Sequence, residues 1–377
     1  MNETPNIHPA LLPSGLRDTL PPEAELEARS VASIMDCFAA HGFQRVNPPL
    51  LEFEESLFSG SGAATSEQAF RLMDPESQRM MALRADTTPQ IARLATTRLA
   101  ASPRPLRLAY EGQCLRVRGS HLQPERQIAQ AGIELIGHDA AEADAEIILT
   151  AVAALAAIGL TNISVDLTIP RLIPELLADV PAAKQALLAH ALDRKDGAAV
   201  TELGGDSLLL QLLEASGPAE RGVPALLAIA LTGEAKTQVL RLADTVEAIK
   251  RAKPDLQLTV DPVEFRGYQY HTGVCMTLFA PGRQAELGRG GRYLCGDSEP
   301  ATGITLYPDT IFRLAPLVPL RPRLYLPHGT PAGRAEAFRA QGYATIAGLA
   351  PHAAPKDEAL RLGCSHVLLN DTITPAL

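Results

Sequence analysis

Four short polar segments of the sequence carry side chains that could bind a charged ligand. In the first, LRADTTPQ at 83–90, Asp86 and Thr88 stand in the turn before a predicted helix, where they could contact a ligand or cap the helix. In the second, Arg116 and Arg118 point to one face of a predicted strand. An arginine on such a face can hold a carboxylate or phosphate through paired hydrogen bonds, or it can form weak surface ion pairs.

The third segment is a predicted strand with one polar face that suits the floor of a binding site. Gln130 and Glu134 share that face with Gly132, where the missing side chain leaves room for a ligand close to the backbone. The exposed outer face of a sheet gives the same alternation, so the pattern alone leaves both interpretations open.

The fourth segment, FRGYQYHTG at 265–273, combines Arg266, Tyr270 and His271, and GRGGRY follows at 288–293. Together they supply cationic, aromatic and imidazole groups beside a backbone that lacks side chains. Aromatic core packing with a hydrogen-bonded histidine is the alternative. GRGGRY does not follow a strand and open a helix, so it is not a dinucleotide-binding fingerprint.

The elements around these segments predict an α+β protein with an antiparallel sheet core. Long strands at 106–118 and 126–136 can pair, and a loop rich in Gly, Ser and Ala is predicted at 56–68. Residues 171–252 are rich in Leu and Ala and predict four or five short helices. The predicted domains are a core at 1–170 and 253–317, a helical insertion at 171–252, and a small α/β unit at 323–377 behind the linker PLVPLRP.

Composition disfavours several functional classes. The formal charge is −9, from 34 basic and 43 acidic residues, which disfavours the wrapping of nucleic acid. No signal sequence is recognisable, and the longest apolar run, 147–160, is too short to span a bilayer. The five cysteines are scattered without a C-x-x-C pair, which predicts neither a disulfide framework nor a zinc site. We expect a reduced, cytoplasmic protein without a metal or cofactor.

Taken in order, these segments resemble the signature motifs of histidyl-tRNA synthetase and its inactive relatives. PSGLRD at 13–18 is similar to the start of that family, LRADTTPQ to the end of its first class II motif, and residues 116–130 to its second motif. FRGYQYHTG and GRGGRY resemble its two histidine-specific motifs. The resemblance spans about residues 10–315. It implies a class II aminoacyl-tRNA synthetase-like antiparallel sheet flanked by helices, an inserted helical domain, and a homodimer formed through this core.

The resemblance also implies a histidine pocket. Asp86 and Thr88 would face the α-amino group together with Gln130. Arg266 would pair with the carboxylate, and Glu134 would accept the imidazole N–H. The implied histidine-binding residues are Asp86, Thr88, Arg116, Gln130, Glu134, Arg266, Tyr270 and His271.

The nucleotide half departs from the synthetase pattern. Arg118 replaces a glutamate, Pro124 interrupts an expected basic pair, and Thr310 replaces the arginine of the third motif. These changes remove charge stabilisation for ATP and predict no adenylation and no catalytic residue. In the histidine half, His271 stands where a tyrosine is usual. The tail after Pro322 is too short for a complete anticodon-binding domain, which argues against tRNA binding.

RADTTPQIAR and PATG at 300–303 resemble the regulatory subunits of ATP phosphoribosyltransferase, a branch of the same family. This resemblance implies a non-catalytic subunit that activates a short-form catalytic subunit at the first step of histidine biosynthesis, in a hetero-octamer of four copies of each. It also implies feedback inhibition by L-histidine. A divergent histidyl-tRNA synthetase and an amino-acid-binding paralogue are the alternatives.

Overall fold

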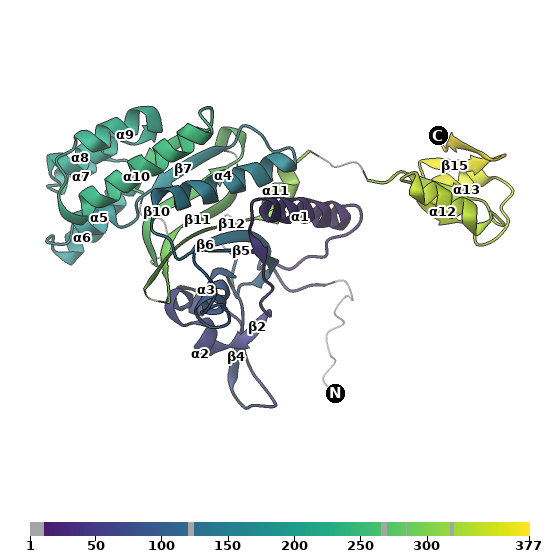
Figure 1. Ribbon diagram of the computed structural model, residues 1–377, viewed down its shortest axis with the longest axis horizontal. Helices are drawn as coiled ribbons and strands as arrows, with labels where there is room; N and C mark the ends of the chain where they lie inside the picture. The colour runs from purple at the N-terminus through teal and green to yellow at the C-terminus, as the bar shows by residue number, and fades with distance from the viewer. Residues whose placement is uncertain (1–10, 120–123, 265–269, 284, 297, 317–319) are drawn as a thin grey trace, which may run out of the picture. The chain divides into compact units, whose positions relative to one another are not determined.

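The computed structural model in Figure 1 describes residues 11–119, 124–264, 270–283, 285–296, 298–316 and 320–377. The chain divides into two compact units, Met1–Pro316 and Leu317–Leu377. Among the described residues, no helix is both long enough and apolar enough to cross a membrane.

A nine-stranded sheet runs through the larger unit, in the order β1-β5-β6-β12-β11-β10-β7-β9-β8. Every neighbouring pair from β5 to β7 is antiparallel, which confirms the predicted fold class. The long strands predicted at 106–118 and 126–136 are β5 and β6, and they pair with Tyr110 opposite Gly132. The strands are β1 Gln44–Arg45, β5 Leu106–Leu115, β6 Gln127–Ile136, β7 Ser164–Thr168, β8 Gly217–Pro218, β9 Gln257–Asp261, β10 His271–Phe279, β11 Glu286–Cys295 and β12 Glu299–Leu306.

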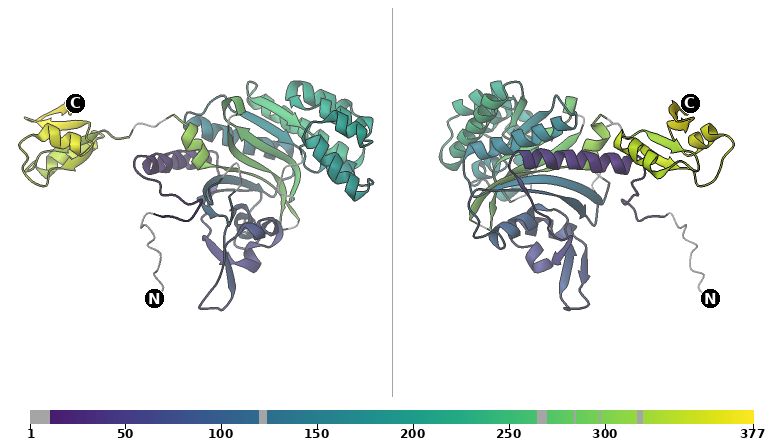
Figure 2. Two further views of the ribbon diagram at one scale, coloured as in Figure 1. Left: turned by 180° about the vertical axis from the view of Figure 1, so that it is seen from behind. Right: turned by 45° about the vertical axis from the view of Figure 1, so that its right-hand side comes forward.

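Helices cover both faces of this sheet (Figures 1 and 2). One face carries α1 (Glu23–Ala40), α4 (Ala141–Ala157), α10 (Gly233–Ala252) and α11 (Pro308–Leu314). Helix α4 is apolar on most of its surface because it lies between α1, α10 and the sheet. On the other face, Ile91 and Ala95 of α3 (Thr88–Thr96) pack with Tyr110 and Tyr293. The predicted polar segments converge on this second face.

A small three-stranded sheet lies beside α3. The prediction of a loop at 56–68, close to this sheet, is wrong. This segment contains the end of α2 (Glu54–Leu57) and the 3₁₀ helix η1 (Gly60–Gln68). Small residues allow tight packing here: a Cβ at Gly62 would lie 2.0 Å from the Leu57 carbonyl oxygen. The composition that is typical of a loop therefore serves close packing instead. The strands are β2 Leu51–Phe53, β3 Arg71–Met73 and β4 Met80–Leu83, in the order β2-β4-β3.

Residues 171–252 contain six helices rather than four or five short ones, and α10 alone has 20 residues. Gly222 lies inside α9, where a Cβ would be 2.4 Å from Val260 of β9. The glycine thus permits close packing rather than ending the helix. The remaining helices are α5 Leu172–Leu176, α6 Ala182–Asp193, α7 Gly197–Glu202, α8 Ser207–Glu214 and α9 Ala219–Ala228. Strand β8 pairs with β9, so this segment also extends the large sheet.

The smaller unit has a four-stranded sheet in the order β14-β13-β15-β16. Its strands and helices alternate as predicted, but β16 was missed. The chain returns through Asn370 and Asp371, both with positive φ, so that β16 pairs antiparallel with β15. The elements are β13 Arg323–Leu326, α12 Ala332–Ala340, β14 Ala344–Ala347, α13 Pro355–Arg361, β15 His366–Leu369 and β16 Thr372–Pro375.

Candidate ligand-binding site

A polar pocket opens on the face of the large sheet that carries α3. Its empty volume is about 410 Å³, which includes the space at its mouth that is open to solvent. The turn before α3 and strands β6, β10, β11 and β12 supply its walls. Arg266 lies outside the described residues. The other seven sequence-predicted residues all line the pocket: Asp86, Thr88, Arg116, Gln130, Glu134, Tyr270 and His271.

Glu134 of β6 is a buried carboxyl group in this pocket, with 1% of its surface exposed. It accepts hydrogen bonds from the Thr88 hydroxyl at 3.0 Å and the Tyr293 hydroxyl at 3.1 Å. Burial raises the pKa of Glu134 to about 8, so the carboxyl is largely protonated at neutral pH. Gly303 stands opposite on β12, and a Cβ there would lie 1.7 Å from Oε2 of Glu134. Only glycine at 303 leaves room for this carboxyl.

Asp86 is held by Gln130 rather than acting as a helix cap. The Gln130 side-chain oxygen accepts from the Thr87 backbone N–H at 3.0 Å and the Thr87 hydroxyl at 2.8 Å, while its Nε2 donates to Asp86 Oδ1 at 2.9 Å. The α3 N-cap residue, Thr87, makes no side-chain capping bond. Because the Gln130 oxygen already accepts several bonds, Asp86 is the better acceptor for a cationic ligand group. Gln130 also lines the pocket, so its contact with a ligand stays a prediction.

The space beside Gly132 is filled by the protein itself. A Cβ at Gly132 would lie 2.4 Å from the Tyr110 hydroxyl. The Tyr110 hydroxyl also lies 2.7 Å from the Thr305 hydroxyl and 3.5 Å from the Thr88 hydroxyl, and both threonines line the pocket. The hypothesis that Gly132 admits a ligand close to the backbone is therefore wrong. This glycine admits a tyrosine that supports the pocket lining from below.

Cationic and aromatic groups line the rest of the pocket. Arg289 Nη2 lies 2.9 Å from Glu286 Oε2, and Arg116 Nε donates to the Ala85 carbonyl at 3.4 Å. The ring centroid of Tyr270 is 4.5 Å from that of His271. Sequence reasoning noted the GRGGRY and third-motif segments but assigned no ligand contact to their residues. The lining residues missed in this way are Arg289, Gly290, Gly291, Tyr293, Gly303, Ile304, Thr305 and Tyr307.

The turn that carries Asp86 is anchored by Arg84, which sequence reasoning also missed. Arg84 is 4% exposed, and its Nε donates to the Gln113 carbonyl at 2.8 Å. Its Nη1 donates to the Pro48 carbonyl and to the Gln90 side-chain oxygen, each at 3.2 Å. An arginine at the end of a strand gives no periodic signal, so its burial could not be read from the sequence. These bonds fix the turn to β5, to the segment between β1 and β2, and to α3.

The residues of the nucleotide half do not form a second charged site here. Arg118 is exposed, and neither it nor Thr310 lines the pocket. Arg126 instead holds the N-terminal segment: its backbone N–H donates to the Gly15 carbonyl at 2.8 Å, and its Nη1 donates to the Ser14 carbonyl at 3.2 Å. Arg126 is therefore occupied by internal contacts.

Comparisons with known proteins assign the chain to a family. A family model described as histidyl-tRNA synthetase matches residues 15–311. A curated relative from Paramagnetospirillum magneticum, named ATP phosphoribosyltransferase regulatory subunit, is 52% identical over 374 residues and covers 98% of this chain and 99% of its own. A relative with the same name from Rhodospirillum centenum is 51% identical over 363 residues, covering 95% of this chain and 94% of its own.

Solved structures share the fold. The first is described as an ATP phosphoribosyltransferase regulatory subunit/histidyl-tRNA synthetase from Bacillus halodurans. It has a TM-score of 0.79 at 23% identity and covers 96% of this chain and 97% of its own. Histidyl-tRNA synthetase from Nostoc has a TM-score of 0.77 at 16% identity, with coverage of 95% and 91%. At these identities the likeness concerns architecture alone.

Proposed function

Since the chain belongs to the family of ATP phosphoribosyltransferase regulatory subunits, we propose that it performs no chemistry of its own and controls a separate, short-form catalytic subunit. In this proposal it raises the turnover of that subunit and carries feedback inhibition by L-histidine. Identity of 52% over nearly the whole chain to a relative with that name supports the proposal most strongly. The preserved polar pocket supports the histidine part.

The pocket offers a complementary partner to each polar group of histidine. The Asp86 carboxylate suits the α-ammonium group because a cation with three donors needs acceptors. Glu134 suits the imidazole, since its carboxyl can accept from or donate to a ring nitrogen according to its protonation. Arg116 and Arg289 form a cationic edge for the ligand carboxylate.

The nucleotide half supports a non-catalytic role. Adenylation needs cationic groups placed around the phosphates of ATP. In the described residues, Arg126 is held by the N-terminal segment, and Thr310 supplies no charge. A pocket with partners for each polar group of an amino acid, beside a nucleotide half with fewer cationic groups than the synthetase pattern, suits a sensor better than a ligase.

The test combines the purified chain with a short-form catalytic subunit and measures turnover with and without histidine. We expect the chain to raise turnover and histidine to lower it. Glu134→Gln should weaken histidine binding by about 1–3 kcal/mol in calorimetry, because a buried partner becomes poorly matched. The matched control is Glu76→Gln, which removes an exposed carboxylate far from the pocket lining.

Two outcomes would contradict the proposal. Equal turnover with and without the chain would remove the regulatory role. Histidine-dependent exchange of pyrophosphate into ATP by the chain alone would favour the synthetase alternative. Unchanged binding and unchanged feedback in Glu134→Gln would place the histidine site elsewhere, while leaving activation intact.

Assembly is a separate part of the proposal. We infer a homodimer through the synthetase-like core and a hetero-octamer with four catalytic subunits, without bound tRNA. Light scattering of the chain alone and of the mixture measures both masses. A monomeric chain, or a mixture without a larger species, would contradict the assembly.

A further inference from the structure

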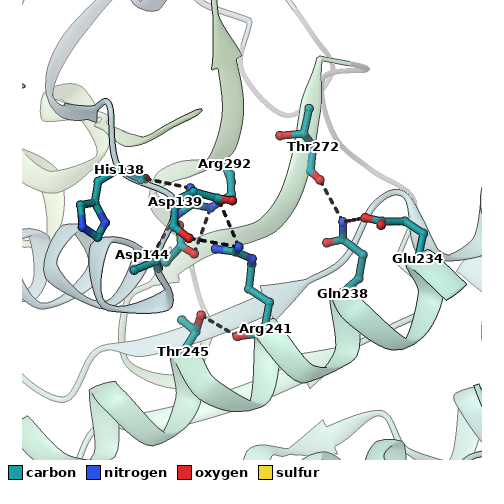
Figure 3. Close-up of polar contacts among 10 residues, drawn as sticks. His138, Asp139, Asp144, Glu234, Gln238, Arg241, Thr245, Thr272 and Arg292 are labelled. Carbon is teal, nitrogen blue, oxygen red and sulfur yellow. Dashed lines mark hydrogen bonds and ion pairs between the residues drawn. The ribbon is translucent and has the colours of Figure 1, made fainter. Parts of the chain in front are cut away.

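An ion-pair cluster with a buried centre lies on the face of the sheet that carries α4 and α10 (Figure 3). Its centre is Arg292 of β11, which is 4% exposed and pairs with the fully buried Asp144 of α4. The next residue along β11, Tyr293, points to the opposite face and donates to Glu134 in the pocket. Neighbouring residues of one strand thus join the pocket to the cluster.

Arg292 clamps the turn that connects the pocket floor to α4. Its Nε donates to Asp144 Oδ2 at 3.2 Å, and its Nη2 lies 3.0 Å from Asp144 Oδ1. The remaining N–H groups reach the carbonyls of His138 and Ala140 at 3.1 and 2.9 Å, and Asp139 Oδ1 at 3.1 Å. Four hydrogen bonds and the ion-pair contact with Asp144 Oδ1 therefore hold the guanidinium group. The turn held in this way begins where β6, the strand of Glu134, ends.

Helix α10 joins the same cluster from the helical segment. Arg241 Nη2 lies 3.0 Å from Asp139 Oδ1, the oxygen that Arg292 also contacts, and it donates to the Asp139 carbonyl at 3.2 Å. One turn earlier, Gln238 Nε2 donates to the Thr272 carbonyl at 3.2 Å, beside His271 of the pocket. Helix α10 is thus tied to both β11 and β10 behind the pocket (Figure 3).

The α10 connection leaves polar atoms unsatisfied. Nη1 of Arg241 and Oε1 of Gln238 are buried and have no hydrogen-bond partner in the part of the chain that the structure describes. Buried polar groups without partners cost free energy. A small displacement of the helix that pairs either atom would offset part of its cost. The outer side of α10 carries Leu240 and Asp244 at two surface hollows, so such a displacement would reach the surface.

We propose that Arg292, Asp139 and Arg241 couple the ligand pocket to the position of α10. Arg292 and Arg241 are positioning residues: neither lines the pocket, and both act through Asp139 and the turn after β6. A ligand that contacts Glu134 changes the hydrogen bond between Tyr293 and Glu134. Because Arg292 is the next residue on β11, a displacement of Tyr293 also moves Arg292. Arg292 then moves the turn after β6 and, through Asp139, helix α10. This coupling rests on the proposed function, because it assigns a route by which histidine in the pocket affects the catalytic subunit.

The test removes only the contact between Arg241 of α10 and Asp139. In Arg241→Leu the Arg292–Asp144 pair stays in place, and Arg251→Leu is the control, since it removes the same charge from α10 at an exposed pair with Glu247. The coupling ratio is the histidine Kd of the full chain with the catalytic subunit divided by the Kd without it. Allosteric ratios are commonly about 5–150-fold. We expect Arg241→Leu to bring the ratio within about twofold of unity while binding to the isolated chain stays within about twofold of the wild type.

Hydrogen exchange gives a second readout that needs no partner. Histidine should change the exchange of α10 amides in the wild type and in Arg251→Leu, but not in Arg241→Leu. Arg241→Lys, which keeps one charged donor near Asp139, should restore part of both effects. If Arg241→Leu does not fold, Asp139→Asn weakens the contacts of Asp139 with both Arg241 and Arg292, at a side chain that is 60% exposed.

The outcomes separate this inference from the proposed function. A wild-type ratio of one, with no effect of histidine on turnover, defeats the proposed function. The coupling route alone is defeated by a different result: the wild-type ratio is above one, and Arg241→Leu and Asp139→Asn both preserve it. In that case histidine also still changes the hydrogen exchange of α10 amides in both variants.

Discussion

Replacing Glu134 by glutamine should make the stability of the larger unit less dependent on pH. The native pKa of Glu134 is about 8, against an ordinary value of 4.5. The native state therefore keeps the proton between these values while the unfolded chain releases it. Folding takes up a proton in this interval, so the stability of the wild type falls as the pH rises from 4.5 and levels off above about 8.

The size of the effect follows from the two pKa values. At about 1.36 kcal/mol per pH unit, the interval gives an upper limit of ~5 kcal/mol for the loss at high pH. Glutamine has nearly the same shape and no proton to release, so Glu134→Gln lacks this loss. The variant should therefore gain stability relative to the wild type between pH 5 and 8.5. Other titrating groups are common to both proteins and cancel in the difference.

The assay is urea unfolding followed by far-ultraviolet circular dichroism, because the chain has no tryptophan. The wild type, Glu134→Gln and the exposed control Glu76→Gln are compared at pH 5, 6.5 and 8.5. A difference between wild type and Glu134→Gln that is the same at all three pH values would refute the assigned protonation. A pH effect of equal size in Glu76→Gln would show that it does not arise in the pocket.

Three further predictions follow from the pocket and the two units. Gly303→Ala should weaken histidine binding at least about tenfold and destabilise the fold by about 1–3 kcal/mol, because the added methyl group displaces the Glu134 carboxyl; calorimetry and urea unfolding measure the two effects. The chain should show no histidine-dependent pyrophosphate exchange, since Arg118 and Thr310 replace nucleotide-binding groups. A chain ending at residue 316 should bind histidine within about twofold of the full chain, because all the described pocket residues precede that position.

Each of these predictions has a matched comparison. Gly333→Ala, in α12, adds a methyl group that meets nothing within 4 Å and should leave histidine binding unchanged. An authentic histidyl-tRNA synthetase is the positive control for exchange. Residues 317–377 expressed alone should not bind histidine. Normal binding by Gly303→Ala, measurable exchange, or loss of binding on truncation would contradict the corresponding argument.

The order of the polar segments predicted the gathering of the site. Alternation places Gln130 and Glu134 on one face of β6, and antiparallel pairing with β5 and β12 then brings the other segments to them. The alternation of polar and apolar residues does not predict which neighbouring side chain fills a given space. The gap at Gly132 looked suited to a ligand, but the cross-strand partner Tyr110 occupies it. That outcome depends on register, which emerges only in the folded sheet.

The hydrogen-bond partners of the site residues could not be predicted from the sequence either. The Thr88 hydroxyl was expected near the ligand amino group or as a cap, yet it donates to Glu134 across the sheet. Gln130 was expected to bind the ligand, yet its carbonyl oxygen accepts from Thr87. Arg292 lies in a segment that resembles a histidine motif, and it faces away from the pocket. Residue type and spacing predicted where polar groups gather, whereas the partner of each group depends on tertiary contacts.

The pairing of Tyr110 with Gly132 has an evolutionary consequence. A smaller residue at Tyr110 would open space beneath the threonines of the pocket in a single step, without altering any residue that lines it. Any side chain at Gly132 would instead collide with Tyr110 and with the backbone of β12. Position 110 can therefore change alone, whereas position 132 stays restricted to glycine by the β12 backbone even after Tyr110 has changed. A lineage that acquires a larger effector has the change at Tyr110 open to it while it retains Gly132.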